Sequence, residues 1–379
     1  MRKENAAMEE QKLKHFGMLI ISLMARENLS RETVREAFSD ILFGDQPDLQ
    51  KGAFLAALRM KGETVEEIAG CFDAIYNLDT NKVKIDKDTL VDNCGTGMDS
   101  LKTFNISTLS AIVAASKGVR LARHGAAAIT SRCGTVDLCR ALGVDVDCDV
   151  GIVSQSVETC GLGLFNGMSP KVHPGGLGRV LSQIRFGTTL NIAASLANPA
   201  LPSLGARGVG SPGQIEPTIE VMRRIGYRKA VVYHGWDEKG DRGMDELSTL
   251  GKSRLGLLKE DGDVEYLELY PEDAGLTRGS YEDIRPMEGV ADESVDAIRT
   301  LAGRGKKSRT DIVAFNAGII LWLAGKSLSL RDGVQTALEE IKSGRPLKKL
   351  VEWVSVQNRN PGRGRGVISG LAAKAGICL

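Results

Sequence analysis

The sequence carries almost no net charge. Its 379 residues include 49 Lys and Arg against 48 Asp and Glu, which gives a formal charge of +1 at pH 7. A balanced surface creates no overall field that would hold nucleic acid or a membrane, so any anion must be bound by a local group of residues. We therefore expect no membrane partner, and the charge disfavours a nucleic-acid partner.

Long apolar runs and paired cysteines are also missing. No window contains the roughly 18 apolar residues that identify a membrane-spanning helix, and the first residues, MRKENAAMEEQKLKHFG, are too charged for a signal peptide. The 7 cysteines form no Cys-x-x-Cys pair, which disfavours a zinc site and a disulfide framework. These absences predict a cytoplasmic protein with reduced thiols.

Two regions with different apolar patterns follow each other along the chain. Residues 1–78 contain apolar residues at helical spacing, separated by turn signals, and predict a small all-helical N-terminal domain. The polar residues 79–90 predict a hinge or linker. Residues 91–379 alternate β-branched runs with helical patterns, which is typical of an α/β domain with a central, mostly parallel sheet flanked by helices. We expect a helix at 175–186 to complete the helical domain.

The α/β region also gives boundaries for single elements. Its β-branched runs predict strands at 119–122, 144–146, 162–165, 229–233 and 265–269. Helical spacing predicts helices at 136–142, 217–225, 292–301, 312–323 and 330–342. Residues 357–379 are rich in arginine and glycine and predict a flexible tail, with a flap over the site or a weak RNA contact as the alternatives.

One stretch carries the clearest chemical signal. A predicted strand ends at Cys94, the turn Gly95-Thr96-Gly97 follows, and a helix is predicted to begin after Asn105. In such a turn several backbone N–H groups face one point, and the helix dipole adds positive charge there, so a phosphate fits. A GTG turn alone is explained equally well as an ordinary connection between a strand and a helix. Neighbouring hydroxyl and charged side chains favour the phosphate site.

Two acidic pairs follow the predicted strand 229–233. Asp237-Glu238 and Asp245-Glu246 offer the oxygen ligands that Mg²⁺ takes beside water and substrate phosphates, although an acidic loop is often only a solvated one. A phosphate loop and a Mg²⁺ site together suit a sugar donor with a diphosphate leaving group. The chain has no Ser-His-Asp order, HExxH motif or Walker lysine, so a hydrolase or a P-loop protein has little support.

These motifs in combination resemble the anthranilate phosphoribosyltransferase family, whose fold is shared with the pyrimidine nucleoside phosphorylases. The resemblance runs from AFLAALRMKGETVEEIAG at 53–70 to the helices near residue 343, and it includes GTGMDSLKTFNIST at 95–108 and LANPA at 196–200. It implies a Mg²⁺-dependent transfer of phosphoribosyl from phosphoribosyl pyrophosphate to an aromatic amine or a similar nitrogen acceptor. It also implies a homodimer that forms through the helical domain.

The resemblance assigns roles to single residues. Ser107, Asp245 and Glu246 are the implied Mg²⁺ ligands, because the family's DE-hydrophobic-Ser motif favours this acidic pair over Asp237-Glu238. Apart from the resemblance, we expect Arg123 to guide the anionic donor or an acidic acceptor, and His124 either to polarise the acceptor or to have a structural role only, so both are candidate catalytic residues. The residues implied to bind the phosphates of the donor are Gly95, Thr96, Gly97, Asp99, Thr103, Asn105, Ser107, Thr108 and Ser131.

The acceptor half departs from the family pattern. Ala126 stands where the family has an asparagine that binds anthranilate, and the family's acceptor-binding arginine falls on Leu181, with Arg179 and Arg185 nearby. Loss of a partner for a carboxylate removes a charged hydrogen bond worth roughly 1.5–3 kcal/mol. The acceptor therefore stays open. The candidate acceptor-binding residues are Ala126, Pro170, His173, Arg179 and Leu181.

Two other functions stay open as well. Nucleoside phosphorylases of this fold carry Lys-His-Ser before the glycine loop, whereas this chain has Asp92-Asn93-Cys94. A non-catalytic paralogue that binds nucleic acid or another phosphorylated ligand is expected to have a basic face, which the charge balance does not favour. Met98 replaces a glycine of the family's phosphate loop and would stiffen that turn.

Overall fold

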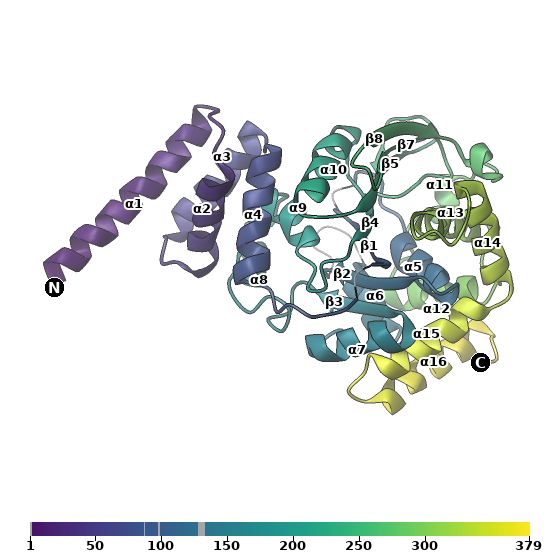
Figure 1. Cartoon of the computed structure of the whole chain (residues 1–379). Helices are drawn as coiled ribbons and strands as arrows, with labels where there is room; N and C mark the ends of the chain where they lie inside the picture. Colours follow the sequence, from purple (N-terminus) through teal and green to yellow (C-terminus); the bar gives the residue numbers. More distant parts are fainter. Residues whose placement is uncertain (1, 87, 98, 128–132) are drawn as a thin grey trace.

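A mixed sheet forms the centre of the larger domain in the computed structural model, which describes residues 2–379 except 87, 98 and 128–132 (Figure 1). Its strands are β1 Leu90–Gly95, β2 Arg120–Gly125, β3 Leu162–Asn166, β4 Leu204–Gly208, β5 Lys229–Trp236, β6 Gly243–Met244, β7 Ser253–Leu258 and β8 Val264–Leu269. Their order is β3-β2-β1-β4-β5-β7-β8, and β6 pairs with β5. The strands from β3 to β5 are parallel, whereas β6, β7 and β8 are antiparallel to their neighbours.

Helices cover both faces of the sheet. They are α5 Ile106–Ser116, α6 Thr135–Ala141, α7 Val150–Cys160, α10 Ile215–Arg224, α11 Tyr281–Ile284, α12 Val290–Leu301, α13 Lys307–Leu323, α14 Leu330–Lys342, α15 Arg345–Val356 and α16 Pro361–Ala375. Along β5, Val231 and Tyr233 pack into a core with α5 and α13, while Ala230 and Val232 pack into a second core with α10 and the helical domain. The alternation follows from the two-residue period of a strand. No helix in the described part of the chain is long and apolar enough to cross a membrane.

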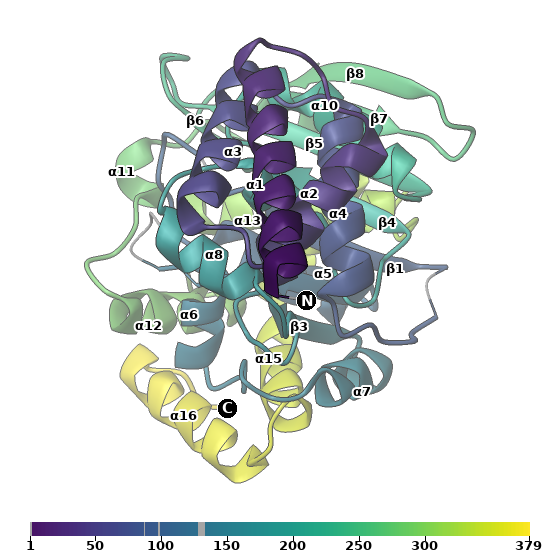
Figure 2. The same ribbon diagram turned by 90° about the vertical axis from the view of Figure 1, so that its left-hand side faces the viewer.

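A layer of helices packs beside this domain. It consists of α1 Arg2–Met24, α2 Arg31–Phe43, α3 Asp48–Lys61 and α4 Val65–Leu78, joined by α8 Leu177–Ile184 and α9 Thr189–Leu196. Thr64 and Glu67 form a capping box that fixes the start of α4. Helix α1 lies at the outer edge, away from the sheet (Figure 1), and runs across the face turned to the viewer in Figure 2. The predicted fold class, a small helical domain and a larger α/β domain with a mostly parallel sheet, is confirmed.

Asp79, the C-cap residue of α4, connects the end of this helix to the segment that begins α8. Its carboxylate accepts hydrogen bonds from the backbone N–H groups of Gly175 and, at 3.0 Å, of Leu177. Leu177 begins α8, which occupies the place of the helix predicted at 175–186. The start of α8 and the end of α4 are therefore held together by one carboxylate.

The strand predicted at 144–146 is wrong. These residues lie in the turns between α6 and α7, and the N–H of Asp145 donates to the carbonyl of Gln357 at 3.1 Å. Val144 and Val146 are nevertheless buried in the core beside α5. An apolar-polar-apolar pattern of three residues reports burial, but it is too short to distinguish a strand from a packed turn.

The flexible tail predicted for 357–379 is also contradicted, because most of it forms α16. Asn360 caps this helix by accepting a hydrogen bond from the N–H of Arg363 at 3.2 Å, and Ile368 is buried in the large core. A Cβ at Gly364 would lie 2.5 Å from the Val354 side chain. At this position glycine serves a close approach of two helices and not mobility.

Candidate active site

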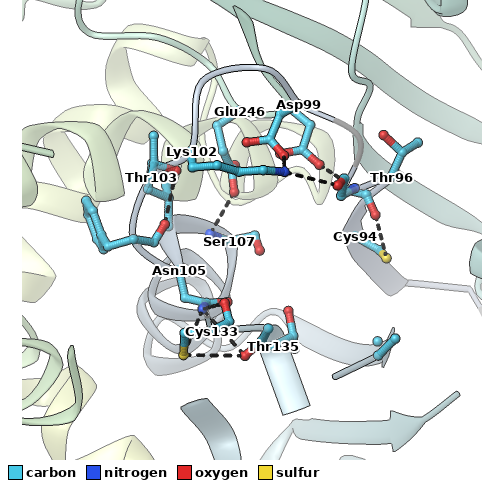
Figure 3. Close-up of a pocket in the computed structure, with 18 of the residues that line it drawn as sticks. Cys94, Thr96, Asp99, Lys102, Thr103, Asn105, Ser107, Cys133, Thr135 and Glu246 are labelled. Carbon is cyan, nitrogen blue, oxygen red and sulfur yellow. Dashed lines mark hydrogen bonds and ion pairs between the residues drawn. The ribbon is translucent and has the colours of Figure 1, made fainter. Parts of the chain in front are cut away.

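A cavity of about 190 Å³ opens where β1 and β2 end and α5 begins (Figure 3). The carboxyl ends of parallel strands and the first turn of a helix meet here, which is the usual place for a ligand in such a sheet. Its described lining consists of Cys94, Gly95, Thr96, Gly97, Asp99, Lys102, Thr103, Phe104, Asn105, Ile106, Ser107, Gly125, Ala126, Ala127, Cys133, Gly134, Thr135, Asp245 and Glu246.

The phosphate loop and the acidic pair are in direct contact. The N–H of Gly97 donates to Asp245 Oδ2 at 2.8 Å, and the N–H of Ser107, in the first turn of α5, donates to Glu246 Oε1 at 2.9 Å. The two partners lie 148 residues apart in the sequence in the first bond and 139 residues apart in the second. Two motifs that are distant in the sequence thus form one site, joined by hydrogen bonds from backbone N–H groups to the two carboxylates.

Burial makes both carboxylates difficult to ionise. The pKa of Asp245 is raised to about 6, mainly because burial disfavours the charged form and further because of the charge of Asp99. The pKa of Glu246 is raised well above its usual value, again mainly by burial and then by the charge of Asp245. Glu246 Oε2 is buried and has no hydrogen-bond partner in the described part of the chain. A cation placed at this oxygen would relieve the unfavourable charge.

The oxygen atoms at this cavity fit a magnesium ion that takes some ligands from the protein and the others from a substrate. In the described ranges, no group of three or more His, Cys, Asp or Glu side chains is arranged to hold a metal. The chain offers two carboxylates and the hydroxyl of Ser107, all oxygen ligands, at one cavity. Mg²⁺ commonly binds to one or two carboxylates and takes its remaining ligands from water and phosphates.

Glycines at the strand ends make room for the acidic pair. A Cβ at Gly95, the last residue of β1, would lie 2.2 Å from the carboxylate of Asp245. A Cβ at Gly208, the last residue of β4, would lie 1.6 Å from the carbonyl oxygen of Asp245, and one at Gly235 would lie 2.4 Å from that of Glu246. Only glycine permits such an approach of two backbones.

Arg123 places a buried positive charge behind the first turn of α5. Its guanidinium donates to Asn93 Oδ1 at 2.8 Å, to Thr108 Oγ1 at 3.1 Å and to Ser107 Oγ at 3.3 Å. These partners are uncharged, so they orient the guanidinium without neutralising it. The charge adds to the positive end of the helix dipole and favours an anion in front of Ser107.

Comparisons with known proteins show the family of the chain. The model described as the glycosyl transferase family a/b domain matches residues 87–347, and the model of that family's helical bundle domain matches residues 18–78. The anthranilate phosphoribosyltransferases of Methanothermobacter thermautotrophicus and Anaeromyxobacter dehalogenans (strain 2CP-C) are 35% and 37% identical to the chain over 346 and 338 residues. The alignments cover 90% and 89% of this chain and 97% of each relative. The chain belongs to the anthranilate phosphoribosyltransferase family.

Solved structures of this family have the same fold. The anthranilate phosphoribosyltransferase of Thermus thermophilus has 31% sequence identity and a TM-score of 0.80, with 89% of this chain and 99% of that chain covered. The Saccharomyces cerevisiae enzyme, in a complex with PRPP and Mg, has a TM-score of 0.78 at 22% identity, with coverage of 91% and 98%. The resemblance inferred from the motifs is confirmed, and the chain is a glycosyltransferase of this family.

The structure brings most of the predicted donor and metal residues to the cavity. Thr108 is the exception: it is fully buried and accepts a hydrogen bond from Arg123. Ser131 lies outside the described residues, as does Met98. The predicted residues that line the cavity are Gly95, Thr96, Gly97, Asp99, Thr103, Asn105, Ser107, Ala126, Asp245 and Glu246.

The predicted catalytic residues lie behind the cavity lining. Arg123 and His124 are 2% and 4% exposed. His124 Nε2 lies 3.1 Å from Nε2 of His173, whose Nδ1 is 2.7 Å from the carbonyl oxygen of Asp79. Burial lowers the pKa of both histidines, and for His124 the neighbouring His173 lowers it further. The two rings therefore favour their neutral forms, and direct roles of Arg123 and His124 in catalysis remain predictions.

The predicted acceptor residues are not gathered at this cavity, apart from Ala126. Pro170 and Arg179 are exposed, and Arg179 Nη1 lies 3.8 Å from Asp48 Oδ1. Leu181 is buried among the apolar side chains of the helical domain. Their contribution to acceptor binding stays a prediction.

Sequence reasoning missed several residues of the lining. Lys102 lies within the phosphate-loop stretch, but the sequence assigned it no role. Cys133 joins the site through Asn105, whose side-chain amide donates to the Cys133 carbonyl at 2.8 Å. The signal for Lys102 was its place between Asp99 and Thr103; Cys133 has no signal in the sequence, because tertiary contact alone brings it there.

Replacing Gly208 with alanine should displace the acidic pair. The new methyl group would overlap the carbonyl of Asp245, and overpacking of this kind costs about 1–3 kcal/mol. We expect a lower melting temperature and loss of donor binding, measured by thermal unfolding and calorimetry. Gly213→Ala is the matched control, because a Cβ there meets no atom within 4 Å. Equal behaviour of both variants would contradict the packing argument.

Asp245→Asn should stabilise the metal-free chain at neutral pH. The folded-state pKa of Asp245, about 6, exceeds its ordinary value of 3.8, so the native state loses stability as the pH rises through this window. In EDTA we expect a higher melting temperature for the variant than for the parent at pH 7.5 and a smaller difference at pH 5. Glu158→Gln, on the exposed side of α7, is the control. A lower melting temperature of Asp245→Asn at pH 7.5 would refute the assigned burial cost.

Proposed function

We propose that this chain transfers phosphoribosyl from phosphoribosyl pyrophosphate to a nitrogen acceptor, with Mg²⁺ as the cofactor. The contact of Asp245 and Glu246 with the N–H groups of Gly97 and Ser107 carries the proposal, because it unites a metal-binding pair and a phosphate loop at one cavity. The relative from Saccharomyces cerevisiae, solved with PRPP and Mg, supports the same donor and metal.

Different residues would bind the metal ion and the phosphates of the donor. Ser107, Asp245 and Glu246 would hold the metal ion, which when bound supplies charge neutralisation for the leaving pyrophosphate. The loop from Gly95 to Gly97 would lie against the phosphates of the donor, and Arg123 orients Ser107 and adds positive charge behind it.

The chemical step needs positioning more than a strong side-chain base. As the bond to pyrophosphate breaks, C1 of the ribose becomes oxocarbenium-like and the acceptor nitrogen attacks the opposite face. Fixed positive charges near the departing diphosphate would stabilise this transition state. The burial of Arg123 and His124 is therefore compatible with activity.

We propose that the acceptor differs from anthranilate, or that anthranilate binds to this chain more weakly than to related enzymes. Ala126 lines the cavity without an amide group, and Leu181 offers no charge to a carboxylate. Arg179 faces Asp48. An aromatic amine, a carboxylated ring or another nitrogen heterocycle is consistent with these residues.

Calorimetric titration with phosphoribosyl pyrophosphate tests the donor half. We expect binding in the presence of Mg²⁺ that is lost in EDTA and in an Asp245→Ala, Glu246→Ala variant, because the acidic pair supplies the protein's carboxylate ligands. Glu158→Ala, on the exposed face of α7, should bind as the parent does. Absence of binding in the parent under all conditions would reject the transferase and favour a non-catalytic binding protein. Where binding is found, product formation with a panel of aromatic amines, anthranilate first, identifies the acceptor.

We also propose that the chain forms a homodimer through its helical domain. On α1, Met18, Ile21 and Met24 are 59%, 57% and 74% exposed, and on α3 Leu49 is 88% exposed. Large apolar side chains gathered on one domain usually mark an interface. The outer position of α1 leaves this surface accessible to a second copy (Figure 2).

Light scattering coupled to size exclusion tests the dimer. We expect Met18→Lys together with Ile21→Lys to convert a dimer into a monomer, because burying two ammonium groups in the interface is unfavourable. Leu328→Lys is the control, because Leu328 is 97% exposed and lies in the α/β domain. A parent protein of monomer mass, or a variant that stays dimeric, would contradict this interface.

A further inference from the structure

The cavity has an unbalanced set of charges. Its described lining contains three carboxylates, Asp99, Asp245 and Glu246, and one cationic side chain, Lys102. A diphosphate is itself an anion, so it requires positive charge at the point of contact. Lys102 is the side chain of the lining that can supply this charge directly, whereas Arg123 acts from behind the helix.

The backbone of Lys102 is held from two sides. Its carbonyl accepts a hydrogen bond from the hydroxyl of Tyr281, in α11, at 3.0 Å. One residue earlier, the N–H of Leu101 donates to the carbonyl of Gly243 at 2.8 Å. The start of the side chain is thus fixed by contacts to two other segments of the domain. Its flexible four-carbon stem allows the ammonium to move between nearby acceptors.

The ammonium lies beside Asp99 and the phosphate loop. Figure 3 shows the Lys102 side chain extending across the cavity toward Asp99. Its Nζ lies 2.7 Å from Asp99 Oδ1 and 3.3 Å from the carbonyl oxygen of Gly97. The side chain is 33% exposed, and an ammonium has three N–H donors, so two protein partners leave one for a ligand. Both protein partners of the ammonium belong to the loop that lines the cavity.

We propose that Lys102 is a donor-binding residue that contacts the diphosphate of the sugar donor and supplies, from the protein itself, part of the positive charge that the metal ion otherwise provides. Asp99 holds the ammonium at the cavity before the donor arrives and competes with the diphosphate for it. Two consequences follow. Pyrophosphate binds weakly even without a divalent cation, and removal of the Asp99 charge strengthens that binding. The inference rests on the proposed function, because it names a further residue for the same donor.

Calorimetric titration with inorganic pyrophosphate in EDTA, and with phosphoribosyl pyrophosphate at saturating Mg²⁺, tests Lys102. We expect Lys102→Met to abolish the metal-independent binding of pyrophosphate and to weaken donor binding about ten-fold or more at saturating Mg²⁺, since a charged hydrogen bond is lost. Lys102→Arg should restore most of both affinities. Lys117→Met is the matched control, because Lys117 lies at the far end of α5, beside Glu340 and outside the cavity. Lys102→Met affinities equal to those of the parent would overturn the proposal.

Asp99→Asn gives a response of opposite sign. In EDTA this variant should bind pyrophosphate more tightly than the parent, and the double variant Asp99→Asn, Lys102→Met should bind no better than Lys102→Met alone. A gain that persists in the double variant would show that Asp99 acts only through its own charge and would overturn the role of Lys102. A parent that binds the donor with Mg²⁺ but shows no effect of Lys102→Met refutes this inference alone. A parent that binds neither ligand refutes the proposed function as well.

Discussion

Two adjacent carboxylates buried against backbone N–H groups form the contact on which the rest of the site depends. Gly97 and Ser107 each donate to one of them, and Arg123 reaches the hydroxyl of Ser107 from behind. The contact is only partly favourable, since burial raises the pKa of both acids. Buried carboxylates remain ionised at neutral pH only when charge or hydrogen bonds compensate. A cation bound between these carboxylates would supply that compensation and favour their ionised forms.

The sheet topology explains how distant segments reach this contact. β1 and β4 are parallel neighbours, so Gly95 and Gly208 end side by side, opposite each other in register. The segment that carries Asp245 directly follows β6, which pairs with β5, and it passes over both glycines before the chain re-enters the sheet as β7. Replacing either glycine would separate the acidic pair from the phosphate loop. The site is therefore specified by the backbone as much as by its functional side chains.

The sequence predicted the parts of this arrangement that are encoded locally. The glycine turn, the start of α5 and the DE-hydrophobic-Ser motif each lie within a few residues, and the helices of the N-terminal domain follow clear apolar spacing. β4 and β7 were missed because their sequences, LGARG and SRLGLL, contain no β-branched residue. The tail was misjudged for a related reason, since composition does not distinguish a glycine in a loop from Gly364 in a tight helix contact. The joining of Cys133 to Asn105 depends on tertiary structure and has no local signal.

The donor and acceptor halves differ in how freely their residues can change. The donor half consists largely of backbone N–H groups, glycines and buried charges, and each of these is fixed by the strands and the helix that also hold the core. Leu181, where the family pattern has an arginine, packs with Leu177 and Val180 in the helical core. An arginine at this buried position would require its own polar partners. Leucine at this position therefore keeps the helical domain well packed, and the proposed change in acceptor recognition would leave the donor half undisturbed.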